Sequence, residues 1–258
     1  VYIEGKVADK KATFTVCAEI DYVLYVNGAL VEDVVVPSSI TELSANAFNG
    51  YQGIKTVVIP ESVKTIGAYA FYNCGNLESV TLKEGVTAIH NNTFAECPKL
   101  TSFTFPSSVQ VINSYAFDSK DSTLAEVKFL GNAPLIANTA FSNVKATALY
   151  SAGNASWTED TRQNYGGDLT WRADNTIPGS DASAEPVKMA GGSCGENVTW
   201  ELSSKGLLAV SGTGGITEKP WMADFKDVIK NAVIGEGITS ICGYAFDGCK
   251  RLTEVTFP

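Results

Sequence analysis

The feature that most constrains this chain is a pattern of 23 residues that occurs four times between residues 40 and 129. A phenylalanine stands at Phe48, Phe71, Phe94 and Phe117, each 23 residues after the last. A fixed period of about 20 to 29 residues with leucine-rich spacing is typical of a solenoid, in which each repeat is one coil stacked on the next. The second copy shows the apolar positions: Val63, Ile66, Phe71, Leu77, Val80 and Leu82. The chain is therefore predicted to be a leucine-rich repeat solenoid, mainly parallel β with tight turns and little helix, with antiparallel β-hairpin modules at its flanks.

The repeated apolar residues are expected to face the interior of the coils. Because each coil contacts only its neighbours, damage in the middle of the stack should cost more stability than damage at Phe141, in an eroded fifth copy. The same spacing restarts near Ile229. The expected structural core is Phe48, Phe71, Phe94, Phe117, Phe141 and Phe246.

The residues between the inward positions of each predicted strand point outward. Many of them are small hydroxyl residues, arranged in two columns along the parallel sheet. Such columns could bind an extended protein or glycan, but the same residues are also good β-surface formers with no ligand, and both interpretations stay open. The candidate ligand face contains Thr56, Val58, Ser79, Thr81, Ser102, Thr104, Glu126 and Lys128.

Charge and hydropathy exclude several classes of partner. The formal net charge is -9, the pI is near 4.7, and no cluster of Lys and Arg occurs. Nucleic acid and anionic membrane surfaces require such clusters, so neither is an expected partner. No run of about 18 apolar residues is present, and no membrane insertion is predicted within this chain. Because the chain starts at Val1 without a signal peptide, we expect it to be a fragment.

The sequence offers little for catalysis. His90 is the only histidine and occupies an outward turn position, and the Asp and Glu residues are scattered. Cys74, Cys97 and Cys249 lie three residues after a repeat phenylalanine, so their spacing follows the solenoid period rather than a metal-ligand pattern. These positions predict inward packing residues, and a Cys74–Cys97 bridge between adjacent coils stays open. We expect no catalytic residue, no metal and no cofactor.

The segments around the repeats suggest a division into modules. Asn27-Gly28 predicts a hairpin turn, and this hairpin is expected to shield the open edge of the first sheet. Trp157 to Trp171 lacks the repeat spacing and is interpreted as an aromatic cap, and Pro220 to Phe225 is expected to form one helical turn. The predicted modules are a hairpin or cap (1–30), the array (31–150), the cap (151–173), a linker (174–186), a hairpin module (187–228) and the start of a second array (229–258).

The recurring Ile-Pro-x-x-Val-x-x-Ile-x-x-x-Ala-Phe-x-x-Cys-x-x-Leu pattern resembles the BspA-like leucine-rich repeats of bacterial surface proteins. The resemblance covers residues 31–150 and 229–258, about half of the chain. It implies a secreted or surface-anchored bacterial protein that binds other cells or matrix, and it carries no shared catalytic residues. Lys83 replaces the strand-ending proline, and Tyr51 and Lys120 replace the cysteine.

Two functions follow as hypotheses. The first is a non-enzymatic adhesion protein that presents the solenoid to a protein or glycan partner; the second is an architectural spacer within a larger surface protein. An enzyme is the least favoured alternative. The second array reaches Pro258 with no closure, so we expect either further repeats or end-to-end self-association at its C-terminal edge, near Phe257.

Overall fold

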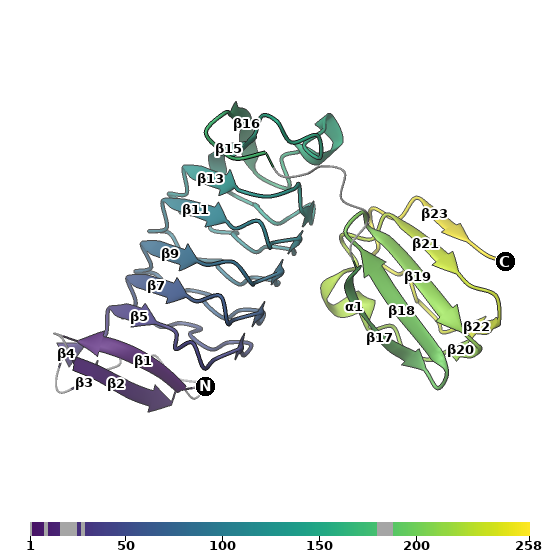
Figure 1. Cartoon of the computed structure of the whole chain (residues 1–258), viewed down its shortest axis with the longest axis horizontal. Coiled ribbons are helices and arrows are strands. Elements are labelled where there is room, and N and C mark those ends of the chain that lie inside the picture. The colour runs from purple at the N-terminus through teal and green to yellow at the C-terminus, as the bar shows by residue number, and fades with distance from the viewer. Residues whose placement is uncertain (1, 8–9, 16–24, 27–28, 180–187) are drawn as a thin grey trace. The chain divides into compact units, whose positions relative to one another are not determined.

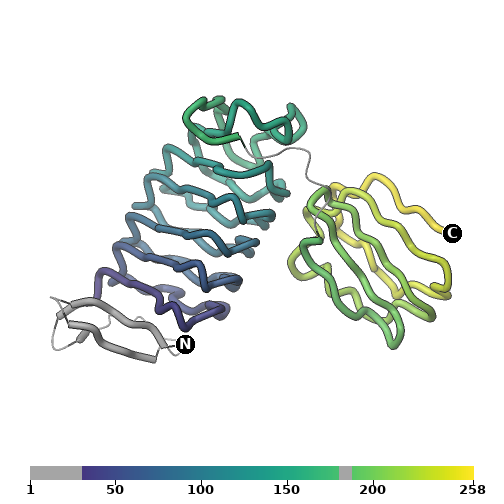
Figure 2. Tube along the Cα trace, viewed as in Figure 1, coloured from purple at the N-terminus to yellow at the C-terminus, as the bar shows by residue number. Residues whose placement is uncertain are grey.

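A computed structural model describes the backbone of residues 2–7, 10–15, 25–26, 29–179 and 188–258, with side chains from residue 31 onward (Figure 1). The chain divides near residue 182 into two compact units. Each unit winds as successive coils, which the tube in Figure 2 follows from the purple to the yellow end of the chain. The two units are described separately.

The first unit is a parallel β-solenoid, as the 23-residue period predicts. Paired residues in neighbouring strands are 23 apart at Val34, Val57 and Val80, which lie side by side in register. Together with β1 (Tyr2–Val7), β2 (Lys10–Thr15) and β16 (Asp168–Asp174), the strands of the coils form two hydrogen-bonded sheets, ordered β2-β1-β5-β7-β9 and β11-β13-β15-β16. The strands of the coils are β5 (Asp33–Val35), β7 (Thr56–Ile59), β9 (Ser79–Leu82), β11 (Ser102–Phe105), β13 (Glu126–Phe129) and β15 (Lys145–Ser151).

A second wall of each coil is made by strands of two residues. They form a five-stranded parallel sheet in which Ala88 pairs with Thr65 and Val111, again at intervals of 23 residues. The strands are β6 (Glu42–Leu43), β8 (Thr65–Ile66), β10 (Ala88–Ile89), β12 (Val111–Ile112) and β14 (Leu135–Ile136).

A third wall, which we call the turn wall, consists of residues 46–50, 69–73, 92–96 and 115–119. Here the coils are joined by main-chain hydrogen bonds without β-strands: the N–H of Asn46 donates to the carbonyl of Ala68 at 3.0 Å and that of Phe48 to Ala70 at 2.7 Å. The residue two positions before each phenylalanine has a left-handed φ, such as 60° at Asn46 and 59° at Tyr69. The turn wall is therefore a third hydrogen-bonded ladder along the stack.

The phenylalanines of the repeat stack on one another through the interior. The ring centroids of Phe48 and Phe71 are 5.0 Å apart, those of Phe71 and Phe94 5.3 Å, and those of Phe94 and Phe117 5.6 Å. Phe117 stacks on Phe141 at 5.3 Å. All five rings are buried, and their separation follows the distance of about 4.8 Å between neighbouring strands. One ring fills each coil.

The open edge of the first sheet is covered by a different hairpin from the one expected. β1 (Tyr2–Val7) pairs with β2 (Lys10–Thr15) and is also antiparallel to β5, with Glu4 opposite Val35. The hairpin β3 (Tyr25–Val26) with β4 (Ala29–Leu30) forms a separate two-stranded sheet. Its turn residues, Asn27 and Gly28, lie outside the described residues. The six-residue β1 offers a longer edge for pairing than the two-residue β3 and β4.

The segment interpreted as a cap continues the repeat. β16 (Asp168–Asp174) is parallel to β15, and Lys145 pairs with Asp168, 23 residues later. Before it, the 3-10 turn η1 (Glu159–Thr161) follows Trp157, whose ring centroid lies 4.9 Å from that of Phe129. The linker also starts later than expected, because Ile177 is buried. A search pattern based on Leu, Ile and Val does not detect this last strand, because aromatic residues replace the aliphatic ones.

The second unit begins with an antiparallel sheet and changes to parallel coils. β18 and β19 are antiparallel around a turn at Gly206, where φ is 80°, as expected, whereas the strand β17 was not predicted. β19 then pairs in parallel with β21, and β21 with β23. The strands of this sheet are β17 (Lys188–Gly195), β18 (Val198–Ser203), β19 (Leu207–Gly212), β21 (Asn231–Ile234) and β23 (Glu254–Thr256).

The interior of the second unit is built around Trp221. The expected helical turn is present as α1 (Trp221–Asp224), and the Trp221 indole N–H donates to the carbonyl of Ala245 at 2.8 Å. The Trp221 ring stacks on Phe246 with centroids 6.3 Å apart. Beside them, β20 (Gly214–Ile216) pairs in parallel with β22 (Ile238–Ile241). Phe246 is only half-buried, in contrast to the five phenylalanines of the first unit.

Candidate binding surface

The outward residues on the strands β5 to β15 differ from one end of this wall to the other. In the middle, Ser79 and Thr81 of β9 and Ser102 and Thr104 of β11 are all exposed. We call these four residues the hydroxyl patch. Glu126, beside Ser102 in the register of β11 and β13, is also exposed. The structure therefore presents small hydroxyl side chains to solvent on two successive coils.

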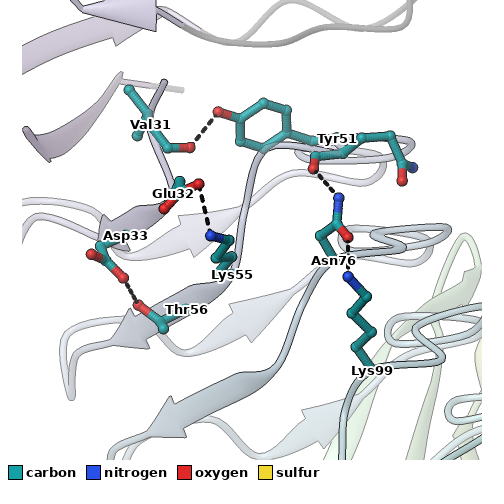
Figure 3. A network of polar contacts seen from close by, with 9 residues as sticks. Val31, Glu32, Asp33, Tyr51, Lys55, Thr56, Asn76 and Lys99 are labelled. Atoms are coloured by element: carbon teal, nitrogen blue, oxygen red, sulfur yellow. Dashed lines mark hydrogen bonds and ion pairs between the residues drawn. The ribbon is translucent and has the colours of Figure 1, made fainter. Parts of the chain in front are cut away.

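At the first end of the sheet the outward residues are engaged with one another (Figure 3). The hydroxyl of Thr56 donates to a carboxylate oxygen of Asp33 at 2.6 Å, one coil away. Lys55 Nζ lies 2.8 Å from Glu32 Oε1, and this hydrogen-bonded ion pair raises the pKa of Lys55. Thr56 and Val58 are half-buried. Thr56 thus links two coils, and its hydroxyl is less available to a binding partner than those of the hydroxyl patch.

At the other end, Lys128 is also committed within the protein. Its Nζ lies 3.8 Å from Asp174 Oδ2, so the side chain crosses from β13 over β15 to the end of β16. Leu149 pairs with Lys128 in register and faces the same side, yet it is 4% exposed. Long charged side chains commonly cover apolar neighbours with their stems, which fits the burial of this leucine beside Lys128. The candidate face therefore narrows to the hydroxyl patch with Glu126 at its border.

Figure 3 also shows a line of amide contacts along one side of the coils. The Asn76 amide donates to the carbonyl of Gln52 at 2.8 Å, and its oxygen accepts from Lys99 Nζ at 2.6 Å. Each partner lies about one repeat away in the sequence. These side chains fasten successive coils together, and they leave the hydroxyl patch on the sheet untouched.

Of the repeat cysteines, Cys74 and Cys97 are buried free thiols, and Cys249 in the second unit is a half-buried one. Burial raises the pKa of Cys97 to about 12 and holds that of Cys74 well above its usual value. A thiol with such a pKa stays protonated at neutral pH and is a poor nucleophile. His90 is half-buried on the second wall, beside β10. Among the described residues, no group of three His, Cys, Asp or Glu side chains could hold a metal ion.

Sequence reasoning overlooked a set of exposed tyrosines on the turn wall. Tyr69 and Tyr115 are 40% and 43% exposed, and both have left-handed φ values, 59° and 58°. The signal was present: counting two residues back from each phenylalanine gives Asn46, Tyr69, Asn92 and Tyr115, an alternation of amide and aromatic. A bulky residue with positive φ is an outlier that calls for an explanation.

The repeat geometry and the family comparison agree. The model of the BspA type leucine-rich repeat region matches residues 18–147 and 225–258 in six copies. The chain belongs to the BspA-type leucine-rich repeat family. Its hydroxyl patch and turn wall both lie within the matched residues. No curated protein matches the chain significantly.

Three solved bacterial structures are similar to this BspA-type chain. The T. pallidum leucine-rich repeat protein TpLRR is 23% identical, with a TM-score of 0.40, covering 56% of this chain and 79% of its own. A leucine-rich repeat protein from Bacteroides ovatus is 17% identical with a TM-score of 0.34, covering 88% of this chain. The pneumococcal vaccine antigen PcpA is 17% identical with a TM-score of 0.40, covering 55% of this chain. The chain covers 49% of the Bacteroides protein and 42% of PcpA.

In the described part of the chain, no helix has the length and apolar character needed to cross a membrane. The longest α-helix among these residues, α1, has four residues.

Proposed function

We propose that this BspA-type protein is a non-enzymatic binding and adhesion protein, displayed outside a bacterial cell, whose hydroxyl patch contacts a protein or glycan partner. The observation that carries the proposal is the exposure of Ser79, Thr81, Ser102 and Thr104 on the strands β9 and β11 of successive coils. Repeat proteins present extended surfaces of this kind to their partners.

The chemistry of the patch suits an extended partner. Each hydroxyl can donate one hydrogen bond and accept others, and the small side chains allow a partner to approach the sheet closely. A single hydrogen bond of this type contributes about 0.5 to 1.5 kcal/mol. Four such groups give weak binding at one copy of the patch, which becomes strong when many copies on a cell surface engage together.

The surface location is supported by the family and by its neighbours in structure. PcpA is described as a vaccine antigen, and other similar chains are leucine-rich repeat proteins of bacteria, one of them named a cell surface protein. A protein on the cell surface can contact other cells or matrix, and many copies of a weakly binding patch can hold such a partner together. Both the surface location and the exposed patch therefore favour adhesion.

An architectural spacer is the second candidate. It is favoured by the five-stranded ladder of the second wall and by the stacked phenylalanine rings, which make each coil contact its neighbours in the stack. A spacer needs this regularity but no particular outward side chain. The two candidates therefore differ in what a change on the hydroxyl patch does.

The test is a double variant, Thr81→Lys with Thr104→Lys, screened on glycan arrays and immobilised matrix proteins. The matched control places the same two charges beside the second wall, at the exposed Thr41 and Thr87, as Thr41→Lys with Thr87→Lys. Adhesion predicts that the first variant loses binding, the control keeps it, and both melt near the wild-type temperature. Wild-type protein with no partner in the screen supports the spacer, whereas equal binding by all three proteins would place the binding site outside the hydroxyl patch.

A further inference from the structure

The turn wall carries a row of aromatic and amide side chains that face solvent. Tyr69 and Tyr115 alternate with Asn46 and Asn92, one residue per coil, at the position two residues before each phenylalanine. The N–H of each of these residues donates to the next coil, for example Tyr69 to Asn91 and Tyr115 to Thr139, so the row is held in a fixed register. We call these four residues the tyrosine-asparagine row.

The fold does not require tyrosine in this row. Asn46 and Asn92 take the same left-handed conformation, with φ of 60° and 55°, and asparagine tolerates this region better than an aromatic residue. The tyrosine rings also add little to the core, because they are 40% and 43% exposed. A strained tyrosine whose ring stays partly exposed, repeated on two coils, indicates that the rings serve something outside the chain.

The surroundings of the row are polar but almost uncharged. The ring of Tyr72 meets that of Tyr69 edge-on at 5.5 Å, and the amide of Asn49 donates to Asn46 at 2.9 Å. In the four segments of the turn wall, only Glu96 and Asp118 are charged. An uncharged partner fits this surface better than a charged one.

We propose that the tyrosine-asparagine row binds a neutral linear glycan that runs along the stack of coils. Tyrosine offers a flat apolar face with a polar tip, which can pack on the face of a sugar ring and bond to its hydroxyls. The asparagine amides between the tyrosines offer both donors and acceptors for sugar hydroxyls.

The spacing of the coils supports a chain rather than a single sugar. Neighbouring coils are about 4.8 Å apart, close to the length of one sugar residue in an extended polysaccharide. Tyr69 and Tyr115 lie two coils apart. They would therefore contact two sugars that are separated by one sugar, and Asn92 would contact the sugar between them. The row thus matches a repeating neutral polymer in period and in charge.

The second unit repeats the feature at the matching position. Tyr244 lies two residues before Phe246, has a φ of 60° and is 80% exposed. Lys219 Nζ lies 5.7 Å from the centre of its ring. A tyrosine at this position is therefore exposed in both units, which favours a shared role over an accident of one coil.

The test uses the whole chain in native gels that contain a neutral polysaccharide: hydroxyethyl cellulose, xylan, galactomannan or mixed-linkage β-glucan. We expect at least one gel to retard the wild type, and the double variant Tyr69→Asn with Tyr115→Asn to lose about tenfold or more of the affinity. Asparagine already occupies this position in the neighbouring coils, so the variant should melt at or above the wild-type temperature. Asn92→Tyr, which places a third ring in the row, should increase retardation.

The control is the hydroxyl-patch variant, Thr81→Lys with Thr104→Lys, which should keep wild-type retardation because it changes a different wall. This separates the glycan proposal from the function proposed for the sheet. Wild-type mobility unchanged in all four gels, or equal retardation of the wild type and the tyrosine variant, overturns the proposal. Loss of a protein ligand in the tyrosine variant, without any gel retardation, would assign the row to a protein partner instead.

Discussion

The thiol of Cys97 donates a hydrogen bond to the main-chain carbonyl of Phe71, 3.2 Å away in the preceding coil. Cys74 makes the same bond to the carbonyl of Phe48 at 3.2 Å, and the Tyr51 hydroxyl donates to that of Val31 at 2.7 Å. In the first three copies, the position three residues after the phenylalanine thus carries a buried donor as well as a packing group, which is why both cysteine and tyrosine occur there. The exposed Lys120 and the buried Val144 hold the same position in the next two copies, so this donor is a feature of the first coils and not of every coil.

The first prediction follows from this bond. Cys97→Val fills the same space but removes the thiol from the carbonyl of Phe71, which still accepts from the N–H of Cys74 at 3.4 Å, so the free energy of unfolding should fall by about 0.5 to 1.5 kcal/mol. Cys97→Ser keeps a donor and should lose less. Urea unfolding of the two variants against the wild type measures the difference. Equal stability of the valine variant and the wild type would show that packing alone selects cysteine.

A second prediction concerns the phenylalanine column. Phe94→Ala removes a ring that stacks on both neighbours and should cost about 3 to 5 kcal/mol. The sequence suggested a smaller cost at Phe141, but the structure places Tyr165 and β16 beyond it and buries Phe141 completely. Phe141→Ala should therefore cost nearly as much as Phe94→Ala. Because Phe246 is half-buried, Phe246→Ala should lower the stability of the second unit by less.

These variants are compared by thermal denaturation with circular dichroism. A Phe141→Ala protein that melts close to the wild type would mean that the coil of β16 does not close the stack. A Phe246→Ala loss as large as that of Phe94 would contradict the smaller burial of Phe246.

A third prediction concerns Trp157, which closes the interior of the first unit. Its indole N–H donates to the carbonyl of Gly131 at 3.2 Å, and its ring meets Phe129 and Trp171 at 4.9 and 5.3 Å. Trp157→Ala should cost about 3 to 5 kcal/mol. Trp157→Phe keeps an aromatic ring and loses the hydrogen bond, so it should cost less. The stability of each variant is measured from the fluorescence of the remaining tryptophans during unfolding. Equal losses of stability in the two variants would show that the hydrogen bond outweighs the ring packing.

The sequence predicted the features that follow from side-chain period. A step of 23 residues placed Phe71 and Phe94 in one interior column and set the register in which Val57 lies beside Val80, because inward positions must be apolar in every coil. The period of 23 continues at β16, but the apolar pattern does not reveal it there, because Trp171 takes the inward position beside Phe129 and Trp157. A pattern defined by branched aliphatic residues does not detect such a substitution.

The features that escaped prediction depend on main-chain geometry between distant segments. The left-handed residues of the turn wall arise because alternate N–H groups must reach the next coil, and residues as different as Asn73 and Glu96 adopt that conformation. β1 caps the sheet through pairing of Glu4 with Val35, which no local signal in residues 2–7 reveals. The candidate face narrowed for a similar reason, since the contact of Lys128 with Asp174 joins residues 46 apart in the sequence.

The last prediction concerns Glu84, whose carboxylate joins two coils after β9. One oxygen accepts from the N–H and the hydroxyl of Ser107 at 3.0 Å each, and the other accepts from the N–H of Ser108 at 2.9 Å. Partial burial raises the pKa of this carboxyl, but the hydrogen bonds from Ser107 and Ser108 outweigh it, and the pKa falls below the usual 4.5. The folded state therefore favours the charged form.

A lowered folded-state pKa makes the contribution of Glu84 depend on pH in one direction. The stabilisation is fully present above about pH 4.5 and is lost as the pH falls through the folded-state pKa, because Glu84 is then protonated in both the folded and the unfolded state. Glu84→Gln should lower stability at pH 7 by about 1 kcal/mol or less, since the site is largely exposed. The gap in melting temperature between wild type and variant should close below pH 4.5. A gap that stays constant from pH 7 to pH 3 would show that the charge of Glu84 does not hold these coils together.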